Sequence, residues 1–101
     1  MEKQLIIKEK ALKQLEKIYS FYSYNVSVEF AETFRIGFFE KVRELLPFYN
    51  RYPYFKITKS KNKNYRQVLY KSHIIIYKIK KNEIEIVGIF YSKRNPNKLK
   101  P

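Results

Sequence analysis

The stretch YRQVLYKSHIIIYKIKKNEIEIVGIFYS, residues 65–92, decides the fold. It holds three runs of β-branched and aromatic residues, Tyr65 to Tyr70, His73 to Lys80 and Glu83 to Phe90, which predict three strands. Lys81-Asn82 fits a tight turn between the second run and the third. Short connections favour an antiparallel meander. Because alternate residues of the middle run are partly apolar on both faces, we expect helices to cover one face.

Before these runs, apolar residues mostly recur at the three- and four-residue spacing of helices. Residues 4–8 form a short apolar run that could be a first strand, and from Glu9 onward one helical face carries Ala11, Leu12, Leu15, Ile18, Tyr19 and Tyr22. Ser23-Tyr24-Asn25 is expected to break this helix, and Asn25 or Ser27 to cap a second. The second helix carries Ala31, Phe34, Phe38, Val42 and Leu45, and should end at Pro47. The order β-α-α-β-β-β predicts one α+β domain over residues 1–101, with its helices on one face.

Charge is distributed unevenly along the chain. Among 101 residues there are 22 Lys and Arg against 9 Asp and Glu. Residues 1–49 hold 8 basic and 7 acidic residues, net +1, whereas residues 50–101 hold 14 and 2, net +12. Such asymmetry favours binding of a polyanion or a strongly acidic partner. The alternative is that the lysines only keep a tyrosine-rich protein soluble.

Composition excludes several kinds of site. The absence of cysteine excludes disulfides, thiolate metal sites and cysteine nucleophiles, and the single histidine excludes a multi-histidine metal cluster. We therefore expect no metal and no cofactor. Apolar runs are far shorter than the roughly 20 residues of a membrane span, so no membrane partner and a cytoplasmic location are expected.

The residues that could bind a polyanion lie next to the three predicted strands or within them. Lys59, Lys61, Lys63 and Arg66 lead into the first strand, Lys93 and Arg94 follow the last, and Tyr65, Tyr70 and Tyr91 could stack on unpaired bases. In a meander, however, Arg66 and the pair Lys93-Arg94 should lie at opposite ends of the sheet. Arg66 and Arg94 are the sharper phosphate ligands, because the guanidinium group is a planar, two-pronged donor.

The other titratable groups of residues 50–101 are weaker candidates for a functional site. His73 could act as an acid or base near neutral pH, but packing on a half-buried strand is the better interpretation. Glu83 and Glu85 share one face of a strand beside a turn and are expected to be solvated edge charges. Gly37 and Gly88 form no phosphate-binding loop.

The order of elements resembles the RelE/ParE superfamily of bacterial toxins from type II toxin–antitoxin modules. The resemblance covers nearly the whole chain and rests on the following pieces: Ala11-x3-Leu15-x2-Ile18-Tyr19, Ala31-x2-Phe34, Leu45-Leu46-Pro47, Tyr65-Arg66-Gln67-Val68-Leu69, His73 to Ile79, Ile86 to Phe90, and Ser92-Lys93-Arg94-Asn95-Pro96. It implies a fold similar to a small microbial ribonuclease, with two helices packed on a curved antiparallel sheet whose concave face is the working surface. The first strand would pair into this sheet.

The resemblance implies a cognate antitoxin as partner and two alternative activities. RelE-like members cleave mRNA on the ribosome, whereas ParE-like members poison DNA gyrase without nuclease chemistry. A metal-independent endoribonuclease is the leading hypothesis, gyrase inhibition the second, and a non-toxic nucleic-acid-binding module the third. For the ribonuclease, the hypothesis assigns catalysis to Arg66, Arg94 and Lys61, and RNA binding to Lys59, Lys63, Tyr65, Tyr91 and Lys93.

Overall fold

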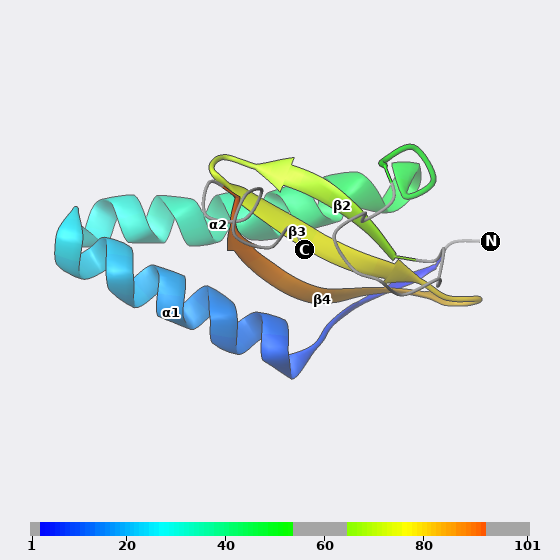
Figure 1. Ribbon diagram of the computed structural model, residues 1–101, viewed down its shortest axis with the longest axis horizontal. Coiled ribbons are helices and arrows are strands. Elements are labelled where there is room, and N and C mark those ends of the chain that lie inside the picture. The colour runs from blue at the N-terminus through cyan, green and yellow to red at the C-terminus, as the bar shows by residue number, and fades with distance from the viewer. Residues whose placement is uncertain (1–2, 54–64, 93–101) are drawn as a thin grey trace, which may run out of the picture.

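Four strands form one twisted sheet (Figure 1). The computed structural model describes residues 3–53 and 65–92. Its strands are β1 (Gln4–Ile7), β2 (Tyr65–Tyr70), β3 (His73–Ile79) and β4 (Glu83–Tyr91), in the order β1-β4-β3-β2. The predicted meander is present, since β3 is antiparallel to both β2 and β4. β1 runs parallel to β4, so the sheet is mixed rather than wholly antiparallel.

A bulge interrupts the pairing of β3 with β4. Ile76 pairs with Gly88 and Tyr77 with Ile86, which leaves Val87 as an extra residue on β4. An extra residue on one strand increases the local twist and bends the sheet. The bulge therefore contributes to the curvature that the resemblance to the RelE/ParE superfamily implied.

The two helices are α1 (Glu9–Asn25) and α2 (Val28–Leu45), and a short 3-10 helix, η1 (Leu46–Phe48), follows. The helix ends at Asn25, the last residue of the predicted break, so the break itself lies just beyond it; Ser23 and Asn25 remain helical, and their side chains donate back to the carbonyls of Ser20 and Phe21. Ser27 provides the cap of α2, and its hydroxyl oxygen accepts from the Phe30 amide at 3.0 Å. Within the described residues, no helix has the length and apolarity needed to cross a bilayer.

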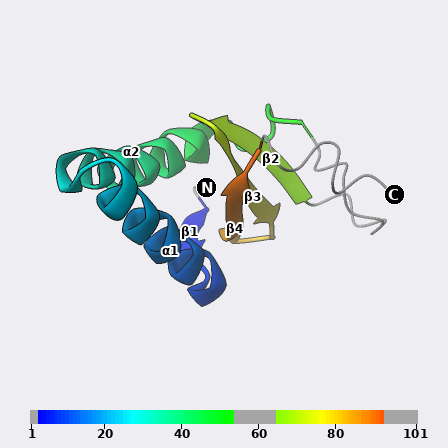
Figure 2. The same cartoon turned by 60° about the vertical axis from the view of Figure 1, so that its left-hand side comes forward.

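Both helices cover the same face of the sheet (Figure 2), and the core lies between the two layers. Its largest fully buried side chains come from every layer: Leu15, Phe34, Phe38, Leu45, Ile75, Tyr77, Ile84, Ile86 and Ile89. Tyr70 anchors β2 to α2, because its hydroxyl donates to the Phe34 carbonyl at 2.8 Å. The Tyr70 ring approaches Gly37 so closely that a β-carbon at this position would collide with the hydroxyl.

Candidate functional site

We call the face of the sheet that is turned away from the helices the outer face. Residues directly opposite each other on paired strands share a face, and the register places the following residues there: Tyr65, Gln67, Leu69, Ile74, Ile76, Lys78, Glu85 and Phe90. Leu69 is 62% exposed, whereas Ile74 and Ile76 are buried. The Lys78 ammonium lies 5.5 Å from the centre of the Tyr65 ring. The outer face therefore combines an apolar strip with a charged end.

The charged end is built around a buried carboxylate. Glu85 is only 7% exposed, and its Oε2 lies 2.8 Å from the Nζ of Lys80. The hydrogen bond from Lys80 lowers the pKa of Glu85, and the positive charges of Lys80, Lys8 and Lys78 act in the same direction. The expectation that Glu85 is a solvated edge charge was wrong. Its carboxylate neutralises a cluster of lysines and is poorly placed to act as an open general base.

Arg66 lies on the other side of the sheet. It pairs with Tyr77, a fully buried core residue, and therefore shares the face that the helices cover. Its Nη1 donates to the carbonyls of Tyr52 at 2.6 Å and Asn50 at 3.2 Å. The sequence suggested Arg66 for a phosphate clamp; in the structure, its Nη1 donates to carbonyls of the protein's own backbone.

Arg66 is one of several groups that hold the segment from Phe48 to Pro53 against the sheet. The Tyr77 hydroxyl donates to the Tyr49 carbonyl at 2.7 Å, and the Gln67 amide donates to the Pro53 carbonyl at 3.0 Å. Sequence reasoning missed this contact because residues 47–64 show no usable period. The aromatic residues of this segment were the available signal, and two of them, Tyr49 and Tyr52, pack against the core.

Of the three predicted stacking residues, Tyr70 is buried against α2, and Tyr65 and Tyr91 are not brought together. Tyr65 lies on the outer face opposite Lys78, whereas Tyr91 pairs with His73 on the helix-covered face. Their β3 partners, Lys78 and His73, are five positions apart, which corresponds to about 17 Å along the strand. This confirms that the two ends of the meander are distant. Lys59, Lys61, Lys63, Lys93 and Arg94 lie outside the described residues.

His73 is a packing residue, as the sequence favoured. It is 3% exposed, and its ring lies 5.0 Å from that of Phe34 and 5.4 Å from that of Tyr91. Burial lowers the pKa of His73, so the neutral imidazole is the folded form near neutral pH. In the described part of the chain, no cluster of three His, Cys, Asp or Glu side chains could hold a metal ion.

The buried His73 predicts a pH dependence of stability. Because the pKa is lower in the folded state than its ordinary value of 6.5, the unfolded chain binds a proton that the folded chain excludes. The free energy of unfolding should therefore fall as the pH falls below about 6.5 towards the lowered folded pKa. Urea denaturation at about pH 7.5 and about pH 5.5 measures this loss.

His73→Phe is the matched variant, because phenylalanine suits the aromatic surroundings and cannot bind the proton. Its stability should change less over this pH range. The lowered pKa values of Glu32 and Glu85 act below their ordinary value of 4.5, outside the range tested. Equal losses in the two proteins would contradict the assignment to His73.

Comparison with known proteins gives one family and several solved structures. Residues 5–96 match the profile of a family described as "ParE toxin of type II toxin-antitoxin system, parDE". A structure titled "Chromosomal ParDE TA system from P. aeruginosa" has a TM-score of 0.75 and 22% identity, and the match covers 89% of this chain and 96% of that one. A YoeB dimer structure from Staphylococcus aureus has a TM-score of 0.54 and 13% identity, over 90% of this chain and 98% of that one. No curated protein sequence matches the chain.

Proposed function

The chain belongs to the ParE toxin family of type II toxin–antitoxin systems, and from this premise we propose that it arrests growth by inhibiting DNA gyrase, without cutting RNA. The position of Arg66 is the observation that favours gyrase inhibition over RNA cleavage. The ribonuclease hypothesis needs this arginine at the open surface, where a substrate phosphate could reach it. Arg66 instead donates to the carbonyls of Asn50 and Tyr52 on the helix-covered side.

Two other groups support the same choice. RNA cleavage by attack of the 2′-hydroxyl benefits from an accessible acid or base. His73, the single histidine, is buried among aromatic rings, and the Glu85 carboxylate is occupied by Lys80. His73 and Glu85 are thus both engaged within the protein. A toxin that inhibits a protein target needs a surface that binds the target, and it needs no accessible acid or base.

We further propose that an acidic antitoxin neutralises the toxin. The similar P. aeruginosa structure is, by its title, a ParDE toxin–antitoxin system. Residues 50–101 hold 14 basic residues against 2 acidic ones, and the outer face carries the exposed Leu69 towards one end of β2 and the Tyr65–Lys78 pair at the other. A helix or strand with apolar and acidic residues fits this surface.

The experiment separates the two activities by what fails first when the protein is induced. We expect trapped gyrase–DNA complexes and intact transcripts in cells, and loss of supercoiling by purified gyrase when purified toxin is added. Adding toxin to isolated mRNA and to translating ribosomes should leave the RNA uncut.

Cut transcripts together with unimpaired gyrase would contradict the proposal and favour the ribonuclease alternative. In that case Arg94→Ala and Lys61→Ala, the remaining predicted catalytic positions, should abolish cutting. Absence of both effects in a toxin that binds nucleic acid would favour the non-toxic binding module.

A further inference from the structure

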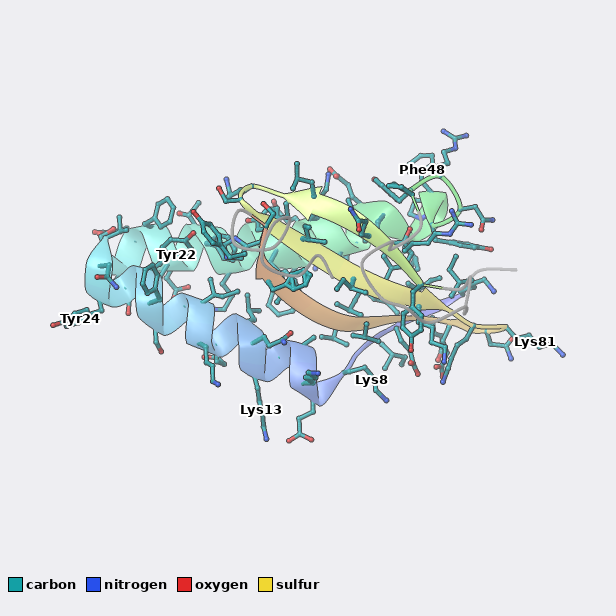
Figure 3. All side chains as sticks on the ribbon, viewed as in Figure 1. Lys8, Lys13, Tyr22, Tyr24, Phe48 and Lys81 are labelled. Carbon is teal, nitrogen blue, oxygen red and sulfur yellow. The ribbon has the colours of Figure 1, made fainter. Side chains whose placement is uncertain are left out.

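The joint between α1 and α2 presents apolar side chains to solvent. Phe21 is 60% exposed, Tyr24 89%, Val26 59% and Val28 58%. The joint extends beyond the end of the sheet (Figure 1), so the sheet does not cover these residues. Figure 3 shows Tyr24 directed away from the molecule, whereas Tyr22 lies between the helices. We call Phe21, Tyr24, Val26 and Val28 the hairpin tip.

The backbone of the hairpin tip is well ordered by local contacts. The Val26 and Ser27 amides both donate to the Tyr22 carbonyl, at 2.8 Å and 3.0 Å. The Tyr22 ring packs edge-on against the Phe30 ring at 4.8 Å, which ties the end of α1 to the start of α2. A surface that is ordered before contact loses little conformational entropy on binding.

The hairpin tip also differs in charge from the rest of the chain. Residues Ile18 to Phe34 contain no lysine or arginine, and this is the longest such stretch in the sequence. The stretch contains two glutamates, Glu29 and Glu32, and Glu32 pairs with Arg35 at 3.0 Å. The formal net charge of the whole chain is +13. A polyanion therefore has no cation to bind at the tip, and an acidic antitoxin is attracted to the basic half instead.

We propose that the hairpin tip is a self-association surface, at which a second copy of this chain docks about a two-fold axis. Two molecules of charge +13 repel each other over most of their surfaces. Because the tip carries no cation, two copies can approach there without bringing lysine or arginine side chains together. A tip-to-tip contact also keeps the two basic halves far apart, because the tip lies beyond the end of the sheet (Figure 1).

The size of the hairpin tip fits a weak dimer. Since one large aromatic side chain can bury about 150–250 Å², the exposed tip presents on the order of 500 Å² per copy. A two-fold contact would bury roughly 1,000 Å² in total, at the low end of specific interfaces. A dissociation constant on the order of 10–100 µM is expected for such a contact.

Sedimentation equilibrium of the full chain tests the proposal, from low micromolar to about 500 µM protein. We expect a monomer–dimer equilibrium that tightens severalfold between about 0.05 M and about 0.5 M salt, because salt screens the repulsion between the two basic molecules. Binding of nucleic acid or of an acidic protein has the opposite salt dependence.

Tyr24→Lys should weaken the dimer at least about tenfold, because it removes the most exposed aromatic side chain and adds like charges at the contact. Leu69→Lys is the matched control, since it adds the same charge at another exposed apolar residue, 62% exposed on the outer face. Its dimer constant should stay within about twofold. Circular dichroism confirms that both variants are folded.

Three results would overturn the proposal. The first is a monomer at the highest concentration in both salts. The second is a dimer that Tyr24→Lys leaves intact or that Leu69→Lys weakens equally. The third is a Tyr24→Lys variant that self-associates normally but no longer inhibits gyrase, which would assign the hairpin tip to the target. Because the mass measurement does not depend on toxicity, it can fail or succeed independently of the proposed function.

Discussion

Arg66→Ala is expected to lower the free energy of unfolding by about 2–4 kcal/mol, because hydrogen bonds that involve a charged donor each contribute about 1.5–3 kcal/mol. Alanine would remove the donor that binds the carbonyls of Tyr52 and Asn50. The segment from Phe48 to Pro53 would then lose part of its attachment to β2. Urea denaturation monitored by circular dichroism measures the change.

Arg51→Ala is the matched control for Arg66→Ala. Arg51 belongs to the same segment, but its guanidinium group lies over the Phe48 ring at 4.9 Å and its side chain is exposed. Its removal should change stability by at most about 1 kcal/mol. If Arg66→Ala keeps full stability and only toxicity is lost, the structural role is wrong and the phosphate clamp inferred from the sequence is restored.

Most of the fold could be predicted because the spacing of apolar residues along the chain follows from the local geometry of a strand or a helix. Alternation of apolar and polar residues with a period of two predicted where each strand of the meander starts. Apolar residues with a period near 3.6 predicted the buried faces of both helices, and Leu15 and Phe34 are among their fully buried residues. The end of α1 was harder to predict. Ser23 and Asn25 favour both turns and bonds to helix carbonyls, and only the tertiary position of the hairpin selects between them.

The candidate site was less predictable because its chemistry depends on which face each residue occupies. Val68 and Tyr70 are buried on the helix-covered face, so alternation alone places Arg66 on that face as well. The carbonyls that it binds come from a segment without a period. Similarly, alternation places Glu85 on the outer face, but its contact with Lys80 depends on the β3–β4 turn, which the sequence does not specify in detail.

Phe34→Ala is expected to have the largest effect on stability. Phe34 is 1% exposed, and its ring lies 5.0 Å from those of Tyr70 and His73 and 5.2 Å from that of Tyr22. It therefore joins both helices to the sheet. Truncation of a buried phenylalanine to alanine costs about 3–5 kcal/mol, through lost burial and the cavity that remains.

A loss of this size is a large part of the roughly 5–15 kcal/mol that stabilises an ordinary domain. For a chain of this length it corresponds to a fall in Tm of roughly 15–30 °C, which differential scanning calorimetry can measure. Phe21→Ala is the matched control, because it removes the same side chain from a position that is 60% exposed. At protein concentrations low enough to keep the chain monomeric, it should change the free energy of unfolding by less than about 0.5 kcal/mol. Equal losses in the two variants would mean that the aromatic cluster around Phe34 does not form the centre of the core.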